Sequence, residues 1–393
     1  MNEVVIIDAV RSAVGRRNGS LGRTRSNDLL GAVQKAVVER SGIDPLVVDQ
    51  VIGGCVTQVG MQSANITRNA WLTAGLPLEV PATTCNVQCG SSQEATMVAH
   101  GLLGSGLAGV AVTCGVESMS MVPMPSATLV PELGVPRGGS YADVYEPTTQ
   151  FEGADRIANA YGITRADTEQ FGLQSQQRAI RAWAEDRFAG QIVPITVPVV
   201  DAEGTVSASK VFDRDECMRE SSLEKLASLK TNRDAPDAVH TAGTSSQISD
   251  GAGALLLATA DRARELGLKP RARIVDSVLV GCDPVLMLEG PIPATRSLLA
   301  RTGLTIDDID VFEINEAFAS VVQAWAKTVG ADMEKVNPNG GAIALGHPLG
   351  GTGVILLTKV LNELERTGGR YGLVSMCCGG GLGTGTIIER LTT

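Results

Sequence analysis

The feature that most constrains this chain is an alternation of β-branched runs with amphipathic segments over its first 117 residues. The run at 4–10 is rich in β-branched residues and apolar apart from Asp8, as expected for a strand buried on both faces. The next segment has apolar residues at helical spacing, with Ser26-Asn27-Asp28 offering an N-cap and Gly42 ending the helix. The same pattern predicts strands at 51–52, 83–87 and 110–113, and helices at 64–74 and 89–103. Strands separated by helices are typical of parallel βαβ units.

The same order of strands returns in the second half of the chain. Residues 7–10 resemble 275–278, 268 residues later; 51–52 resemble 311–312, 260 later; 109–114 resemble 372–377, 263 later. Three ordered matches at nearly one offset indicate a duplicated α/β domain. Two such domains packed together would bring helix N-termini from both halves to one crevice, where folds of this kind bind ligands.

A long segment at about 116–249 interrupts this alternation. It begins rich in Met, Pro and Gly, and two charged helices are predicted near 152–161 and 164–188. We therefore expect an N-terminal domain over 1–117 that is completed by about 250–270. An inserted loop or lid domain follows over 118–249, and a C-terminal domain occupies 271–393.

Charge and cysteine spacing narrow the classes of function. The net charge of −10 argues against general nucleic-acid binding, which needs a basic face. No apolar run approaches the length of a membrane span, and the chain starts in a strand without a basic leader region. The eight cysteines include no C-x-x-C pair, so no metal site is indicated. We expect a soluble cytoplasmic protein with free thiols.

Cys89 lies where a predicted strand gives way to a predicted helix, in the stretch Asn86-Val87-Gln88-Cys89-Gly90-Ser91-Ser92. Free backbone N–H groups and the helix dipole favour a thiolate at such a place. The same N–H groups can stabilise an oxyanion once the thiolate attacks a carbonyl. A small buried cysteine that merely lets a helix and a strand pack closely is the alternative interpretation.

The chain has only three histidines with which a cysteine nucleophile could be paired. His347 is surrounded by glycines, which implies that backbone or ligand approaches it closely, and it is the best candidate for a base. His100 falls inside a predicted helix and is interpreted as structural. His240 precedes a loop of small residues and stays open between the two roles.

A second cysteine, Cys377, ends a predicted strand in another glycine-rich turn. With a tuned pKa it would exchange a proton with substrate; the alternative is an inert core thiol. Its neighbour Cys378 should point to the opposite face of the strand, so only one of the two should reach a site. Asn315, at the start of a predicted helix, is either an N-cap or a functional residue.

One motif is rejected. Residues 104–109 match G-x-G-x-x-G, but they follow a helix and precede a strand. The dinucleotide fingerprint requires the opposite order, so NAD binding is not expected.

Four motifs together make the chain resemble the thiolase family. They are Asn-x-x-Cys-Gly-Ser at 86–91, Asn-Glu-Ala-Phe at 315–318, Asn-x-Asn-Gly-Gly-Ala-Ile-Ala-Leu-Gly-His-Pro-x-Gly at 337–350, and Cys-x-Gly-Gly-Gly at 377–381. Residues 240–251 also resemble the coenzyme A loop of that family. The resemblance implies duplicated βαβαβαββ domains in a layered α-β-α-β-α core with an inserted loop domain.

The resemblance also implies a role for each motif. Cys89 would carry the acyl group, His347 would be its base, and Cys377 would exchange the α-proton. The backbone N–H groups of Cys89 and Gly379 would hold the acyl oxyanion, and His347 with a water positioned by Asn315 the other thioester oxygen. Contacts to coenzyme A are implied for Ser246, Arg219 and Phe318. Coenzyme A enters as co-substrate, no permanently bound cofactor is implied, and the family forms homodimers or homotetramers.

The reaction implied is thiolytic cleavage of a 3-ketoacyl-CoA to acetyl-CoA and a shortened acyl-CoA, in fatty-acid or steroid side-chain β-oxidation. Residues 29–38, 240–250 and 383–390 resemble actinobacterial steroid thiolases in particular. Thr149-Gln150 stands where acetoacetyl-CoA thiolases carry a His-Met pair. A biosynthetic acetoacetyl-CoA thiolase and a non-catalytic thiolase-like lipid carrier remain as alternatives. The retained Cys89, His347 and Cys377 speak against the carrier.

Overall fold

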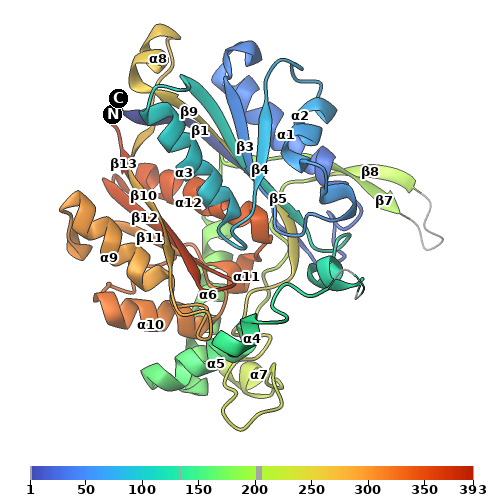
Figure 1. Cartoon of the computed structure of the whole chain (residues 1–393), viewed down its shortest axis with the longest axis vertical. Helices are drawn as coiled ribbons and strands as arrows, with labels where there is room; N and C mark the ends of the chain where they lie inside the picture. The colour runs from blue at the N-terminus through green and yellow to red at the C-terminus, as the bar shows by residue number, and fades with distance from the viewer. Residues whose placement is uncertain (1, 131, 133, 201–205, 393) are drawn as a thin grey trace.

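Strands and helices form two copies of one topology, as the sequence repeat predicts (Figure 1). The computed structural model describes residues 2–130, 132, 134–200 and 206–392. The N-terminal copy comprises β1 (Val4–Ser12), α1 (Ser26–Ser41), β3 (Gln50–Gly54), α2 (Ile66–Thr73), β4 (Ala82–Cys85), α3 (Ser91–Gly104), β5 (Val110–Ser118) and β9 (Ser249–Thr259). The C-terminal copy comprises β10 (Ala272–Gly281), α9 (Pro291–Thr302), β11 (Val311–Ile314), α10 (Ala319–Val329), α12 (Thr352–Thr367), β12 (Tyr371–Cys378) and β13 (Leu382–Arg390). The shorter β2 (Gly15–Arg16), α8 (Ala260–Glu265) and α11 (Ala342–Leu345) lie in the connections.

The strand order and register of the two copies correspond, except that the edge strand β4 has no counterpart strand among the described residues of the C-terminal copy. The order is β4-β3-β5-β9-β1 in one copy and β11-β12-β13-β10 in the other. β3 pairs parallel with β5 and β11 with β12, whereas β5–β9 and β12–β13 are antiparallel. The register also breaks at equivalent places, beside Ile7 in β1 and beside Val275 in β10. These residues are separated by the offset of the sequence match, so the predicted duplication is confirmed down to one irregular position.

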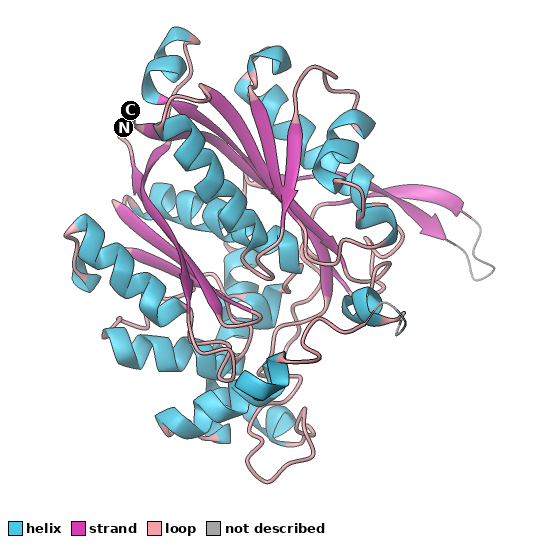
Figure 2. Ribbon diagram, in the orientation of Figure 1, coloured by secondary structure: helices cyan, strands magenta, loops and turns pink. Residues whose placement is uncertain are grey.

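Three apolar clusters divide the copies into layers. The first packs α1 and α2 against the N-terminal sheet, the second encloses α3 and α12 between the two sheets, and the third packs α9 and α10 against the C-terminal sheet. Alternate residues of one strand serve two clusters: Val5 and Ile7 belong to the first, Val4 and Ile6 to the second. The layered α-β-α-β-α core expected from the sequence is therefore confirmed (Figure 2).

The backbones of the two sheets meet over a short length. β1 and β10 pair only at Val5↔Arg273 and Ile6↔Ala272. In the middle layer α3 and α12 pack against each other (Figure 1). The placement of one copy against the other therefore depends on this central pair of helices.

Two polar side chains at the start of α3 fasten it to the C-terminal copy. Ser92 Oγ accepts the backbone N–H of Val354 at 3.1 Å. Gln93 donates through Nε2 to the carbonyl of Val374 and to Thr386 Oγ1, each at 3.0 Å. Both residues face the junction of the two copies. Substitutions at either position would therefore change the contacts between the copies.

The insertion between β5 and β9 contains α4 (Tyr141–Val144), α5 (Gln150–Tyr161), α6 (Arg165–Ala184), β6 (Ile192–Val193), β7 (Ile195–Val200), β8 (Val206–Phe212) and α7 (Leu223–Ala227). The two charged helices predicted near 152–161 and 164–188 are present as α5 and α6. The antiparallel pair β7–β8, which projects from the body in Figure 2, was not predicted. Among the described residues, no helix combines the length and the apolar character that crossing a bilayer requires.

Three local expectations are wrong. The N-cap predicted within Ser26-Asn27-Asp28 is not found there: Ser26 is already the first residue of α1, and Arg25 precedes it without a side-chain cap. The hydroxyl of Ser26 is engaged in a tertiary contact, donating to Gln62 Oε1 at 3.2 Å. The strand predicted at 83–87 ends at Cys85, and the helix predicted from Cys89 begins at Ser91. Residues 86–90 form a turn, because side chains within them satisfy the backbone locally.

Candidate active site

A cavity of about 90 Å³ lies where the N-termini of α3 and α12 approach the turn between β12 and β13. Eight residues were expected to take part in catalysis or in binding coenzyme A, and six of them line it: Cys89, His347, Cys377, Gly379, Ser246 and Phe318. Asn315 contacts one of them from behind, and Arg219 lies elsewhere. Residues from both copies and from the insertion therefore meet at one place, as the duplication implied.

Cys89 is presented by a tight turn. The residue before it, Gln88, has φ of 57°, a left-handed conformation that side chains other than glycine seldom adopt. Asn86 Oδ1 accepts the N–H of Gln88 at 2.9 Å, and Ser91 Oγ accepts the N–H of Val87 at 3.1 Å. Gly54 in β3 allows α3 to start so close, since a Cβ there would lie 2.3 Å from the nitrogen of Ser92. The turn thus holds the thiol at the helix start.

The electrostatic surroundings keep Cys89 protonated at rest. Burial raises the pKa of its thiol to about 11, and the backbone N–H groups of Gly379 and of Cys89 itself oppose that rise. Donors that favour a thiolate also favour any anion formed at the same place. The two N–H groups named in the sequence analysis therefore both act on the Cys89 sulfur.

Cys377 and Cys378 end β12 and point to opposite faces, as expected from strand geometry. Cys377 packs with the cluster that contains Ala317 and Phe318, whereas Cys378 packs in the cluster between the sheets. Burial, followed by the neighbouring Cys89 and Cys378, raises the pKa of Cys377 well above its ordinary value. Cys377 reaches the cavity and Cys378 does not line it.

His347 is fixed in one tautomer by its neighbours. Its Nδ1 lies 2.6 Å from Thr352 Oγ1, whose own hydrogen is donated to the carbonyl of Pro348 at 2.9 Å. The hydroxyl must therefore accept a hydrogen from Nδ1, which leaves Nε2 with its lone pair. Burial lowers the pKa of His347 to about 4, so the ring is neutral near pH 7.

Asn315 follows β11 and is buried, with 1% of its surface exposed. Its Nδ2 donates to His347 Nε2 at 3.3 Å. The N-cap of α10 is Phe318, so the alternative that Asn315 serves as a helix cap is wrong. Its side chain instead holds the free nitrogen of the imidazole.

The residues expected to contact coenzyme A are arranged in two groups. Ser246 and Phe318 line the cavity, and the N–H of Ser246 is held by the carbonyl of Ala317 at 2.9 Å. Phe318 packs edge-on against Phe151 with ring centroids 5.6 Å apart. Arg219 is exposed and donates to the carbonyl of Ala242 at 3.1 Å, away from the thiols.

The two remaining histidines lie outside the cavity lining. His240 is buried between Thr244 Oγ1 at 3.2 Å and Ser320 Oγ at 2.8 Å, and its ring stacks edge-on with Phe318. Burial lowers its pKa to about 4, so the open question about His240 resolves to a neutral residue that supports Phe318. Burial also lowers the pKa of His100 within α3.

Much of the cavity wall was not identified from the sequence. It is contributed by apolar side chains from the insertion and from two loops, with two amides among them: Met119, Met124, Gln150, Phe151, Gln247, Ile248, Leu288 and Leu349. Of these, Gln150 alone was singled out, through its place beside Thr149. No local pattern distinguishes a methionine that lines a cavity from one in a core, because the distinction depends on long-range packing.

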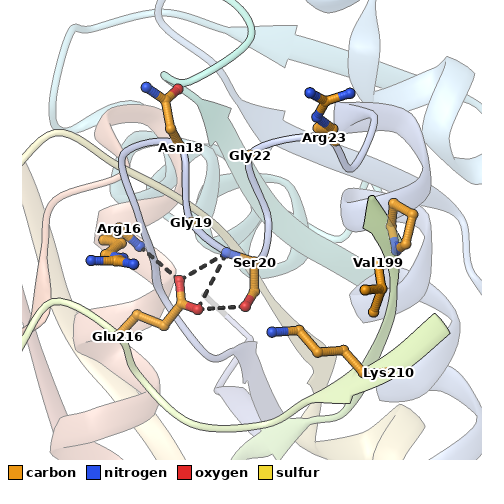
Figure 3. Close-up of a pocket in the computed structure, with 10 residues that line it drawn as sticks. Arg16, Asn18, Gly19, Ser20, Gly22, Arg23, Val199, Lys210 and Glu216 are labelled. Carbon is orange, nitrogen blue, oxygen red and sulfur yellow. Dashed lines mark hydrogen bonds between the residues drawn. The ribbon is translucent and has the colours of Figure 1, made fainter. Parts of the chain in front are cut away.

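A more spacious hollow lies elsewhere on the described surface (Figure 3). It has a volume of about 550 Å³ and is lined by the 16–23 loop, Pro198, Val199, Lys210 and Glu216. Glu216 accepts the backbone N–H groups of Arg16 and Ser20 and so shapes that loop. Its lining contains neither a thiol nor an imidazole, so size alone does not mark the reactive site.

Comparison with known proteins adds a family to this geometry. Residues 4–261 match the family description "Thiolase, N-terminal domain" and residues 268–390 match "Thiolase, C-terminal domain". The whole chain is 47% identical to the steroid 3-ketoacyl-CoA thiolase FadA6 of Mycobacterium tuberculosis, covering 95% of that protein. It is also 42% identical to a beta-ketoadipyl-CoA thiolase of Pseudomonas aeruginosa, with 99% of each chain covered.

A solved structure resembles the fold closely. The crystal structure of the Bacillus anthracis acetyl-CoA acetyltransferase superposes with a TM-score of 0.91. The two chains are 36% identical, and the match covers all of this chain and 99% of the other.

Proposed function

The chain belongs to the thiolase family of acyltransferases, and from that premise we propose that it cleaves 3-ketoacyl-CoA thioesters by thiolysis through an acyl group on Cys89. The observation that carries the proposal is the meeting of two thiols and a neutral imidazole at one cavity. A non-catalytic lipid carrier has no need of such a set.

The first half of the reaction forms the acyl-enzyme. Cys89 Sγ attacks the 3-keto carbon while its proton passes to His347 Nε2, which the Nδ1 tautomer leaves free. The resulting alkoxide accepts the N–H groups of Cys89 and Gly379. The bond between C2 and C3 then breaks, its electron pair forms the acetyl-CoA enolate, and Cys377 returns a proton to C2.

The second half releases the shortened product. Coenzyme A gives its thiol proton to the Cys377 thiolate, and its sulfur attacks the acyl-Cys89 thioester. Collapse of the tetrahedral adduct expels Cys89 Sγ, which takes back the proton held by His347. Asn315 donates to Nε2 in the resting site and gives up that hydrogen bond when the Cys89 proton arrives. Thr352 Oγ1, which accepts the hydrogen of Nδ1, keeps the ring oriented for both transfers. We propose that a water held by Asn315, together with His347, stabilises the thioester oxygen of the enolate.

The cavity wall favours an apolar acyl group. Its described lining contains Met119, Met124 and Phe151 but no Lys or Arg. A dicarboxylic acyl chain, as in the substrate that names the beta-ketoadipyl-CoA thiolases, would bury a charge there without a partner. Met124 and Phe151 are 37% and 36% exposed, so a long or steroid-derived acyl group leaves the cavity between them. We propose such a bulky substrate from fatty-acid or steroid side-chain degradation.

Acetoacetyl-CoA synthesis uses the same residues in reverse and is the second candidate. The similarity to an acetyl-CoA acetyltransferase structure favours it, whereas the apolar wall favours degradation. Steady-state thiolysis of acetoacetyl-CoA, a long-chain 3-ketoacyl-CoA and a steroid-derived 3-ketoacyl-CoA separates them. Highest kcat/KM with acetoacetyl-CoA would contradict the bulky-substrate proposal.

The surroundings of the reaction are also proposed. Ser246 and Phe318 would hold pantetheine, Arg219 the nucleotide, and the 118–249 insertion would cover the substrate. The described thiols are all free, which suits a reducing cytoplasm. A homodimer or homotetramer follows from the family and is measured by light scattering during size-exclusion chromatography.

The decisive variant is Cys89→Ala, which removes the acyl acceptor and should lower thiolysis by about 10⁴-fold or more. Cys378→Ala is the matched control, because that thiol packs on the opposite face of β12. The control should keep its activity within a few-fold. Binding of coenzyme A, measured by calorimetry, should survive in both. Undiminished thiolysis by folded Cys89→Ala refutes the mechanism.

A further inference from the structure

Glu117 is a buried carboxyl group that the mechanism above does not use. It lies near the end of β5 with none of its surface exposed. Burial raises its pKa, and the hydrogen bonds that it accepts oppose that rise. A buried carboxyl group is costly unless it is well satisfied, so its surroundings indicate what it stabilises.

Four N–H groups surround this carboxylate. Oε2 accepts the backbone N–H of Val56 at 2.9 Å and of Gly350 at 3.0 Å. Oε1 accepts the N–H of Thr57 at 3.1 Å and Nε2 of Gln62 at 2.9 Å. An ionised carboxylate accepts about four hydrogen bonds, so every site is used. A glutamine in its place would direct an NH₂ group at donors.

One of these donors, Val56, connects Glu117 to the turn before Cys89. The carbonyl of Val56 accepts Nδ2 of Asn86 at 3.0 Å. The other end of that amide, Oδ1, accepts the N–H of Gln88, the strained residue directly before Cys89. The loop held by Glu117 therefore supports the turn that presents the nucleophile.

A second donor, the N–H of Gly350, connects Glu117 to the loop that carries His347. Gly350 lies three residues after that histidine in the same loop, which begins the approach to α12. The approach is close, since a Cβ on Gly350 would lie 2.9 Å from Glu117 Oε2 and 2.6 Å from the Cα of Cys55. This contact crosses from the N-terminal copy to the C-terminal copy.

We propose that Glu117 is a positioning residue that sets the Cys89 turn against the His347 loop, so that thiol and imidazole come from different copies in a fixed relation. This rests on the proposed roles of Cys89 and His347. Glu117 does not line the cavity and touches neither group directly. Its main effect is on the alignment of the nucleophile with its base, for which small displacements are costly. Its charge also raises the pKa of Cys89, so loss of that charge alone would speed alkylation of Cys89, and only misalignment would slow it.

The test compares Glu117→Gln with Glu216→Gln. Glu216 also holds a loop through backbone N–H groups, but beside the hollow of Figure 3. Glu117→Gln should lower kcat by about 10- to 100-fold, and Glu216→Gln should change it less than about threefold. The rate at which iodoacetamide alkylates Cys89, located by peptide mass spectrometry across pH, should fall in Glu117→Gln alone. The dissociation constant for coenzyme A should stay within about threefold in both.

A second variant covers the case in which Glu117→Gln does not fold. Gly350→Ala keeps the Glu117 side chain in the sequence but forces the histidine loop and the carboxylate apart, and should reproduce the losses of kcat and of Cys89 alkylation. Wild-type kcat and alkylation in whichever of these two variants folds would overturn the proposal. Alkylation is measured without substrate, so a wild-type enzyme that fails to cleave 3-ketoacyl-CoA refutes the proposed function and leaves the Glu117 result interpretable.

Discussion

The connection between β5 and β9 and the connection between β12 and β13 occupy the same place in the two copies. In the N-terminal copy it spans 119–248 and includes the insertion; in the C-terminal copy it is the turn at 379–381. The long connection supplies Met119, Met124 and Phe151 to the cavity wall, and the short one supplies an N–H from Gly379 next to Cys377. One scaffold position therefore contributes the wall for substrate in one copy and reactive groups in the other.

The central helices show the same divergence. α3 and α12 are equivalent, and each is preceded by a loop that carries one reactive side chain, Cys89 or His347. The duplicated fold brings two equivalent loops to one site, and the side chains in those loops determine the chemistry. Variants in one copy and in the other should therefore fail in different ways.

The largest expected difference separates the two cysteines. Cys377→Ala should lower thiolysis of a 3-ketoacyl-CoA by about 10³-fold or more, because no group protonates the enolate carbon. It should still form an acyl-enzyme when incubated with a simple acyl-CoA, because coenzyme A can depart as a thiolate that solvent protonates, whereas the enolate carbon has no other proton donor in the mechanism. Intact-protein mass spectrometry detects the adduct. If folded Cys377→Ala forms no adduct, Cys377 is also required for acylation of Cys89, and the proposed separation of the two cysteine roles is contradicted.

A smaller effect is expected from the residue that orients the histidine. Thr352→Val removes the hydroxyl at Nδ1 and should lower kcat by about 10- to 100-fold with little change in KM. Thr358→Val, also on α12, removes a hydroxyl bonded to the carbonyl of Val354 and serves as the control. A kcat that is unchanged in Thr352→Val and lowered in Thr358→Val would contradict the tautomer assignment.

The wild-type pH profile gives an independent check on that histidine. The base is active when neutral, and burial lowers its pKa from 6.5 to about 4. The acid limb of kcat/KM should therefore be centred near pH 4. A limb near 6.5 would indicate an imidazole in contact with solvent.

The smallest effect should come from the wall of the insertion. Met124→Ala widens the exposed end of the cavity and should change the ratio of kcat/KM for long-chain over acetoacetyl substrate by about 5- to 30-fold, because apolar contacts discriminate by only about 1–2 kcal/mol. Met121→Ala, which alters an exposed side chain outside the lining, is the control. An equal change in both ratios would argue against a role of the insertion in specificity.

The sequence predicted those parts of the molecule that depend on local pattern. Strand and helix order and the repeat follow from periodicity and spacing, and glycine clusters marked His347 and Cys377 as candidates. The grouping of Cys89, His347 and Cys377 in one site followed from the resemblance to thiolases, and all three line the cavity. The N-cap predicted within Ser26-Asn27-Asp28 was wrong because the hydroxyl of Ser26 donates to a tertiary partner, Gln62. Leu288 and Met119 escaped prediction because they reach the cavity through loops whose course is set by long-range packing.

The narrow contact between β1 and β10 has a consequence for how the enzyme responds to stress. The two sheets are paired at only two pairs of residues. The position of the nucleophile relative to its base is therefore maintained by α3, α12 and the polar contacts between the copies. Each sheet retains its own helices and apolar cluster. Heating should therefore misalign the copies before it unfolds either one. The catalytic rate should then be lost at a lower temperature than the secondary structure.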